Sequence, residues 1–328
     1  MRTITAGLAA LAATAVFVGA PVASADTVTL RGAVYTGNPN SPFRIPFHQF
    51  ADFVNEQGGG SVRVDDIVGP EAIPEGQLAR ALADGLVDFV AAPPSYFENL
   101  VPGLGGLSAP RITTQEMRAN GTFDVVNEFL ATGANATMVG LYAGDVPFHI
   151  FTNTPVRTLE EFDGVRLRAT NTVMAFFTEL GAQPMQISRG EIYTALERGV
   201  ANGYSNINTE LFASSWIEVA SYRIGPGFYT PNIAIFMNLD SYNQLDDRQR
   251  AVVKAAGMFV EGGPSWAMQQ AEEEAVTRAV DEHGFEVITF SPEETERFLD
   301  MAYSATWNQI AERAPEFAER VRPLVVGD

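Results

Sequence analysis

Residues 190–202 read GEIYTALERGVAN, and residues 76–88, which lie 114 positions (190 minus 76) earlier, read GQLARALADGLVD. Both follow one pattern without a gap: Gly, an aliphatic residue two places on, an Ala-Leu pair, then a second Gly, an aliphatic residue and finally Asp or Asn. Each copy is typical of a short helix that ends at a glycine and leads into a buried strand. A period of this length is far too long for a solenoid. The repeat therefore predicts two lobes of similar construction, unless two ordinary helix-to-strand units coincide.

The surroundings of the first copy extend the pattern into an alternation of strands and helices. Such an alternation favours parallel sheet layered with helices. Strands are predicted over 27–34, 61–68 and 86–91, and helices over 41–57 and 75–84.

The last third of the chain is predicted to be helical. Helices are expected over 244–258 and 265–283, and we expect Gly262-Gly263-Pro264 to kink or break the chain between them. A short strand over 285–290 precedes a further helix, for which Ser291 supplies the N-cap and Pro292 the first turn, reaching about Ala314.

The N terminus has the layout of a cleavable export signal. Arg2 is followed by an apolar run over 6–20 and by the small residues Ala23-Ser24-Ala25, after which we expect cleavage. This run is too short to span a bilayer comfortably, so a membrane anchor is the weaker alternative. No later stretch reaches 18 uninterrupted apolar residues, so we expect a periplasmic protein without stable membrane insertion.

Composition excludes several classes of function. Asp and Glu number 40 against 21 Lys and Arg, which gives a net charge of −19, and such a chain repels nucleic acid. There is no cysteine, so thiolate metal sites and cysteine nucleophiles are excluded. The acidic field also steers anions poorly, so an anionic ligand would need a dedicated local cation.

Common catalytic motifs are absent from the sequence. It has no G-x-S-x-G, no P-loop and no H-E-x-x-H. Carboxylates are plentiful and some pair could perform acid–base chemistry, which leaves a secreted hydrolase as the alternative class. No spacing singles out such a pair. We therefore expect a protein that is not an enzyme and that holds neither cofactor nor metal.

Residues 159–171 read LEEFDGVRLRATN and carry two arginines on one face of a predicted strand. Val165, Leu167 and Ala169 form the apolar face, opposite Arg166, Arg168 and Thr170. A guanidinium matches a carboxylate with two parallel hydrogen bonds. On spacing alone, a salt bridge within the chain is favoured over a ligand-binding role for these arginines.

These stretches together resemble the solute-binding subunits of TRAP (tripartite ATP-independent periplasmic) transporters, the DctP type. Members typically read L-x-D-L-K-G-x-K-x-R-x-P, then x-L-G-A-x-P, then E-V-Y-x-A-L-Q-x-G-x-V-D-G. This chain has LEEFDGVRLR at 159–168, ELGAQP at 179–184 and EIYTALERG at 191–199. Gly69-Pro70 and the segment 82–88 add matches in the N-terminal part.

The resemblance implies an α/β, two-lobed periplasmic binding protein fold, in which each lobe is a mixed β-sheet flanked by helices and a long helix braces both lobes. The corresponding lobe limits are 26–145 plus about 233–273, and 146–232 plus about 274–328. Such proteins close on a small organic acid and deliver it to a membrane permease. A sensory role for the same fold is an alternative.

The resemblance also assigns residues to the ligand. Arg168 maps onto the family's carboxylate ligand and Asn206 onto a polar position that faces it, while Arg189 lies near the pocket by register. Asn171 is expected to hydrogen-bond polar groups of the ligand.

Departures from the family pattern bear on the type of acid. Phe148 and Tyr96 stand where sialic-acid-binding members carry arginines, and Pro93 stands where they carry Glu, which disfavours sialic acid. Thr170 replaces the usual proline. An aromatic pocket is inferred from Tyr96, Phe97, Phe148 and Trp216, although ordinary core packing is the alternative for each. These residues favour an apolar or aromatic monocarboxylate; Arg189, as a second cation, would restore a C4-dicarboxylate or keto acid.

Overall fold

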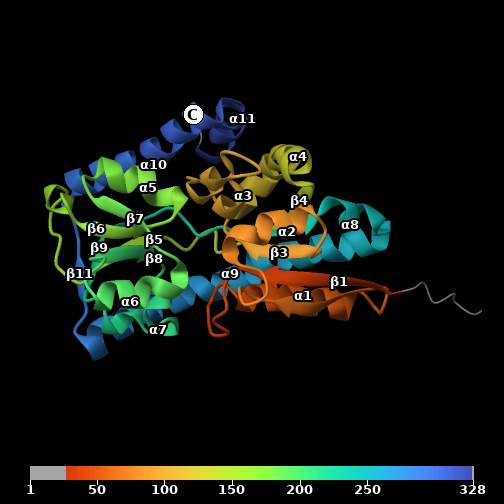
Figure 1. The fold of residues 1–328 in the computed structure, drawn as a ribbon, viewed down its shortest axis with the longest axis horizontal. Coiled ribbons are helices and arrows are strands. Elements are labelled where there is room, and N and C mark those ends of the chain that lie inside the picture. Colours follow the sequence, from red (N-terminus) through yellow and green to blue (C-terminus); the bar gives the residue numbers. More distant parts are fainter. Residues whose placement is uncertain (1–26, 327–328) are drawn as a thin grey trace, which may run out of the picture.

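The computed structural model describes residues 27–326, which form two β-sheets side by side with helices packed around them (Figure 1). The first sheet has the strand order β2-β1-β3-β10-β4, and the second has the order β11-β9-β5-β8-β6-β7. The strands of the first sheet are β1 (Val28–Val34), β2 (Val62–Val68), β3 (Phe89–Ala92), β4 (Ala136–Tyr142) and β10 (Ile233–Asn238). Those of the second are β5 (Phe148–Thr152), β6 (Arg166–Ala169), β7 (Gln183–Gln186), β8 (Gly203–Asn206), β9 (Tyr222–Phe228) and β11 (Glu286–Ile288).

Both sheets are mixed. In the first, β1 pairs in parallel with β2 and β3, while β10 runs antiparallel between β3 and β4. In the second, β6 is parallel to β7 and β8, while β5 is antiparallel to β8 and β9. The two-lobed α/β class expected from the sequence is thus confirmed.

The sequence repeat folds into the same unit twice. The first copy forms η1 (Glu75–Gln77), α2 (Leu78–Ala83) and β3, and the second forms η5 (Arg189–Glu191), α6 (Ile192–Glu197) and β8. Gly85 and Gly199 close the two helices with φ of 72° and 67°. The amide of the residue after each glycine bonds back across the last turn, Leu86 to the Ala81 carbonyl at 2.9 Å and Val200 to the Ala195 carbonyl at 2.8 Å. This helix ending needs a left-handed residue, which explains both glycines.

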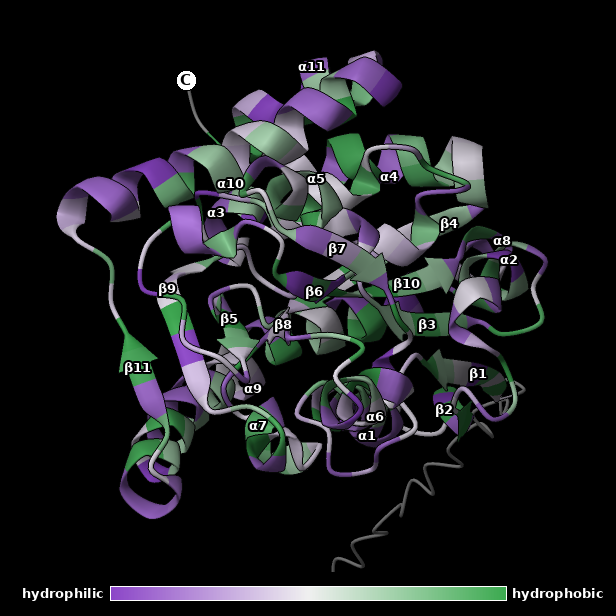
Figure 2. Cartoon of the chain, turned by 60° about the vertical axis from the view of Figure 1, so that its left-hand side comes forward, coloured by the Kyte–Doolittle hydropathy of each residue, from purple (hydrophilic) through white to green (hydrophobic). Residues whose placement is uncertain are grey.

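Helices cover the outer faces of both sheets. In Figure 2, β3 and β10 are mostly hydrophobic, whereas α10 and α11 mix hydrophilic and hydrophobic residues, as helices with one solvent-facing side do. The longer helices are α1 (Ile45–Gln57), α4 (Thr122–Ala134), α5 (Asn171–Glu179), α9 (Asp247–His283), α10 (Pro292–Arg313) and α11 (Pro315–Val326). The short elements are η2 (Pro94–Phe97), η3 (Leu104–Ser108), α3 (Thr114–Ala119), η4 (Glu160–Phe162), α7 (Glu210–Ala213), η6 (Trp216–Glu218) and α8 (Leu239–Gln244).

The chain passes between the two sheets at three places: residues 143–147, residues 229–232 and helix α9. The first two segments contain three non-glycine residues in left-handed conformations, Ala143 at φ 59°, Tyr229 at 39° and Asn232 at 43°. Gly144 lies among them, and a Cβ atom there would stand 2.0 Å from Thr114 Oγ1. The backbone conformation of the crossovers is therefore tightly constrained, as expected of segments that set the angle between two lobes.

The exact limits of the two lobes stay a prediction. The C-terminal helix α11 was assigned to the second lobe, and it packs on α4, beside the first sheet.

Helix α9 corrects one prediction. Gly262-Gly263-Pro264 was expected to kink or break the chain, but no break occurs: α9 runs through these residues as one helix of 37 residues and passes beneath both sheets (Figure 1). Pro264 has no N–H to give the Val260 carbonyl, the usual cost of an interior proline. The Ser265 hydroxyl donates to that carbonyl instead, at 3.0 Å, and accepts the Ala143 amide at 3.2 Å. One side chain thus repairs the helix and ties it to a crossover segment.

Replacing Ser265 with alanine should lower the free energy of unfolding by about 1–3 kcal/mol, because the buried Val260 carbonyl would lose its donor and the Ala143 amide its acceptor. Denaturant unfolding measures the change. Thr277→Ala is the matched control, since the Thr277 hydroxyl donates to the Glu273 carbonyl on the exposed side of the same helix. This substitution should change the free energy of unfolding by less than about 0.5 kcal/mol. Equal effects of the two substitutions would contradict this account of the proline.

The export signal predicted over residues 1–25 lies outside the described residues. Across 27–326, none of the helices combines the length and apolar character needed to cross a bilayer.

Candidate functional site

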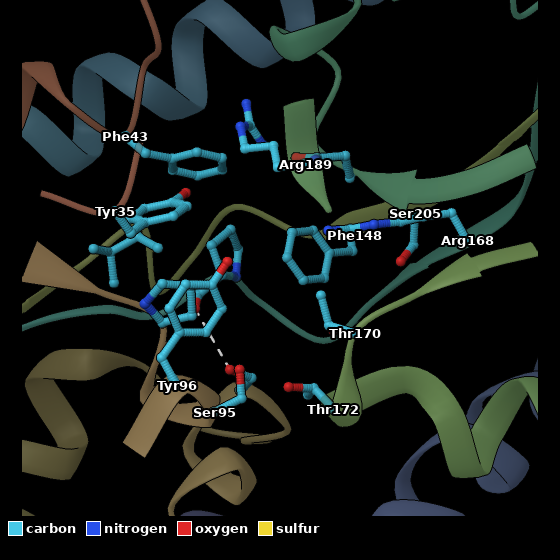
Figure 3. Close-up of a pocket in the computed structure, with 15 residues that line it drawn as sticks. Tyr35, Phe43, Ser95, Tyr96, Phe148, Arg168, Thr170, Thr172, Arg189 and Ser205 are labelled. Atoms are coloured by element: carbon cyan, nitrogen blue, oxygen red, sulfur yellow. Dashed lines mark hydrogen bonds between the residues drawn. The ribbon is translucent and has the colours of Figure 1, made fainter. Parts of the chain in front are cut away.

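A small cavity lies between the two sheets. Figure 3 shows Tyr35, Phe43 and Tyr96 on one side of it and Arg168, Arg189 and Ser205 on the other. Several lining residues lie at or shortly after the end of a strand: Tyr35 after β1, Ser95 and Tyr96 in the turn that follows β3, Thr170 after β6, and Asn206 at the end of β8. The carboxyl ends of parallel strands are where open α/β sheets place their ligands. The second copy of the repeat and the first thus deliver side chains to the same cavity.

Arg168 is a buried cation without a carboxylate partner. It lies on β6 with 7% of its surface exposed, and across residues 27–326 no Asp or Glu oxygen lies within 4.0 Å of its guanidinium. Its Nε donates to the Ile187 carbonyl at 2.9 Å, which fixes the plane of the group. Burial lowers the pKa of Arg168 below its usual value, since removal from water disfavours the charge. The intramolecular salt bridge that the sequence left open is absent from the described part of the chain.

Arg166, two residues earlier on the same strand, has a different environment. Its side chain is exposed and Nη2 donates to the Gly199 carbonyl at 3.0 Å. The structure therefore separates the two arginines that the strand pattern could not rank.

Arg189 also lines the cavity, but a carboxylate accompanies it. Its Nη2 forms an ion pair with Glu210, a side chain with no exposed surface. The guanidinium carbon lies 5.7 Å from the centre of the Phe43 ring and 5.1 Å from that of Trp216. Burial opposes the charge of Arg189, but Glu210 outweighs it and holds the pKa above its usual value. Arg189 is therefore charged and locally neutralised.

Asn206 and the aromatic residues complete the inner wall. Asn206 is buried; its Oδ1 accepts the Ile207 amide at 2.9 Å, and Nδ2 has no acceptor among residues 27–326. Phe148 lines the cavity from β5. Tyr96 donates its hydroxyl to Glu75 Oε2 at 3.0 Å and meets the Tyr35 ring edge-on at 5.6 Å. Burial raises the pKa of the Tyr96 hydroxyl, so it remains a donor.

An outer chamber adjoins the cavity and shares Ser95, Tyr96, Arg168 and Thr170 with it. Asn171 lies in this outer chamber, where Oδ1 accepts from Gln186 Nε2. Glu75 lines the same chamber. The guanidinium of Arg168 thus stands at the boundary between the inner cavity and an outer chamber that carries the carboxylate of Glu75.

Two aromatic residues named from the sequence lie outside the cavity. Phe97 has no exposed surface and packs against Phe236 at 4.1 Å between ring centres, so its assignment to the pocket was wrong. Trp216 packs edge-on against Tyr204 at 4.7 Å and supports Arg189 from behind. Both residues therefore belong to the packed core and do not line the cavity.

Comparison with known proteins identifies the family. Residues 33–313 match the family described as bacterial extracellular solute-binding protein, family 7, the DctP family. The chain belongs to this family. Its members are TRAP solute-binding proteins, which function in transport.

Individual relatives are distant. The chain is 28% identical over 267 residues to uncharacterized protein y4mM of Sinorhizobium fredii, covering 78% of this chain but only 48% of that protein. It is 25% identical to the C4-dicarboxylate-binding protein DctB of Bacillus subtilis, covering 80% of this chain and 78% of DctB. A TRAP periplasmic solute-binding protein from Desulfovibrio salexigens, crystallised with orotic acid, superposes with a TM-score of 0.81 at 16% identity, covering 91% of this chain and 97% of that one.

Sequence reasoning missed several lining residues of this family 7 protein. Tyr35, Phe43, Ser95, Thr172 and Ser205 all face the cavity. The available signal was position: Tyr35 and Ser95 come just after predicted strands, where ligands gather. Glu210 carried no such signal, because nothing in its neighbourhood of the sequence marks its pairing with Arg189.

His149 is a buried histidine that follows Phe148 on β5. Burial, together with the nearby Arg223, lowers its pKa to about 3. An unfolded histidine titrates near 6.5. Between these values the unfolded chain binds a proton that the folded chain does not, so stability falls as pH is lowered.

We expect His149→Gln to flatten the pH dependence of stability on the acid side. In the parent chain, protonation of His149 in the unfolded state should remove roughly 1.5 kcal/mol between pH 6.5 and pH 5. The free energy of unfolding, measured with denaturant at several pH values, gives the difference between the two chains. Parallel profiles for parent and variant would show that His149 is protonated normally when folded.

Proposed function

We propose that this protein captures a small organic acid by closing its two lobes around Arg168 and delivers it to the membrane subunits of a TRAP transporter. The observation that carries the proposal is the buried, unpaired guanidinium of Arg168. A buried charge is costly unless it is paired, so this group requires an external anion. A carboxylate fits, because it can accept two parallel bonds from one guanidinium.

The surroundings of Arg168 support an anion at the same place. Helix α5 begins at Asn171, and its cap residue Thr170 makes no side-chain hydrogen bond to the helix end. Thr170 and Thr172, which flank this end, line the cavity. The N terminus of a helix favours negative charge, so its dipole adds to the field of Arg168.

Charge within the site favours a monocarboxylate. Glu210 neutralises Arg189 on the inner side, and Glu75 adds a negative charge on the outer side. Among residues 27–326, a second carboxylate of the ligand would meet no free cation in either direction. The alternative ligand is a C4-dicarboxylate or a keto acid; the name of DctB motivates the dicarboxylate.

The lining indicates a ligand with an apolar or aromatic body and some polar groups. Tyr35, Phe43, Tyr96 and Phe148 offer ring surfaces. The amide of Asn206 and the hydroxyls of Ser95, Thr170, Thr172 and Ser205 can hydrogen-bond substituents of the ligand. The sequence pointed to the aromatic residues of the lining, whereas most of the hydroxyl groups were identified only from the structure.

The export route is part of the proposal. The family is periplasmic, and the N-terminal sequence supports a signal cleaved after Ala25. A secreted hydrolase is the alternative from a different class, and it would turn over its substrate, whereas a binding protein releases one equivalent unchanged.

Arg168→Ala should weaken binding of the acid on the order of 100-fold or more, because the carboxylate would lose both of its charged bonds. Thermal-shift screening of the mature protein against small mono- and dicarboxylates finds the acid, since a ligand at about 100 times its Kd adds about 2.7 kcal/mol of stability. Calorimetry then compares the variants. Arg166→Ala, on the exposed side of the same strand, is the control and should keep the parent affinity. Full affinity in Arg168→Ala would refute the proposed role.

A further inference from the structure

Glu210 is held by polar contacts on both of its oxygens. It opens the short element α7 and has no exposed surface. Oε1 accepts the Ser41 hydroxyl at 2.9 Å, and Oε2 accepts the Ser214 hydroxyl at 2.6 Å and pairs with Arg189. Both oxygens of the Glu210 carboxylate are therefore held in place by polar partners, and the carboxylate pairs with Arg189 beside the cavity without lining it.

The residues around the Arg189–Glu210 ion pair come from both lobes. Ser41, which donates to Glu210, and Phe43, which contacts Arg189, lie between β1 and α1 on the side of the first sheet. Arg189 itself and Trp216, which also contacts it, belong to the second. Asn38 adds a second bridge, because its Nδ2 donates to the Ala213 carbonyl at 2.6 Å. The ion pair is thus fully enclosed only where the two lobes meet.

The charges of the inner cavity follow from these contacts. Arg168 and Arg189 contribute two positive charges, and the carboxylate of Glu210 compensates the charge of Arg189. What remains for a ligand is one positive charge, on Arg168. If Glu210 were neutral, the buried Arg189 would favour a second anion, and a second negative charge on the ligand would supply it.

We propose that Glu210 sets the charge of the ligand: by neutralising Arg189 when the lobes close, it restricts the site to acids with a single negative charge. This inference rests on the proposed function. It assigns a specificity role to a residue that acts through Arg189 and does not touch the acid.

Glu210→Gln tests the assignment, because glutamine keeps the size and the acceptor oxygen but removes the charge. The probes are two pairs matched in size and differing by one charge: succinamate with succinate, and monomethyl phthalate with phthalate, each titrated calorimetrically at up to millimolar concentration. The parent chain should favour the singly charged member of each pair. In Glu210→Gln the ratio of affinities should shift toward the doubly charged member on the order of tenfold or more.

A rescue variant separates charge from structure. Adding Arg189→Gln to Glu210→Gln removes both charges of the pair, so the preference for the singly charged member should return. A merely structural role for Glu210 would not be rescued by a second substitution in the same contact. Glu218→Gln is the matched control, since Glu218 accepts the Tyr193 hydroxyl at an exposed position and should leave the ratio unchanged.

The possible failures are distinct. Binding by the parent chain with the same affinity ratio in Glu210→Gln would overturn the role of Glu210 and leave the proposed function intact. Binding by the parent chain that persists in Arg168→Ala would overturn the proposed function itself.

Discussion

The guanidinium of Arg168 is held in a nearly dry position with its plane fixed and no carboxylate of the described chain beside it. Desolvating a charge costs several kcal/mol when nothing compensates it. An exposed arginine would impose no such requirement, as Arg166 on the same strand shows. The rest of the site can be understood as the means of keeping this one charge buried, oriented and unsatisfied until an anion arrives between the lobes.

The fold meets this requirement by using one construction twice. Each copy of the repeat supplies a short helix, a left-handed glycine and a central strand, and each strand delivers polar or aromatic side chains to the cavity at or just beyond its end. The two sheets are joined by tightly specified crossovers and by α9, which is continuous because Ser265 compensates for Pro264. Rigid lobes on defined connections allow a ligand to be enclosed by a change of angle without repacking of either core.

The sequence predicted most of the fold because its signals were local. The repeat, the glycine helix ends and the Ser291 cap depend on neighbouring residues, and each formed as expected. The helix break expected at Gly262-Gly263-Pro264 was wrong. The Ser265 hydroxyl that bonds the freed Val260 carbonyl is itself held by the Ala143 amide, which lies more than 100 positions away in the sequence. The family resemblance, which implied a continuous brace, was the better guide there.

The site was predictable only in part. Arg168, Arg189, Asn206, Phe148 and Tyr96 do line one cavity, while Asn171 lies in the adjoining chamber. The pairing of Arg189 with Glu210 depends on two segments that meet only in three dimensions, so no spacing could reveal it. Phe97 was misplaced because an aromatic residue after a strand can point to the core as easily as to the cleft.

The central claim is that the ligand's carboxylate, and no other part of it, rests on Arg168. A crystal structure of the mature protein with its acid bound tests this most directly. The account predicts both carboxylate oxygens within hydrogen-bonding distance of the terminal nitrogens of Arg168, with the body of the ligand against the aromatic wall. A ligand whose carboxylate instead pairs with Arg189, or lies in the outer chamber away from Arg168, would contradict it.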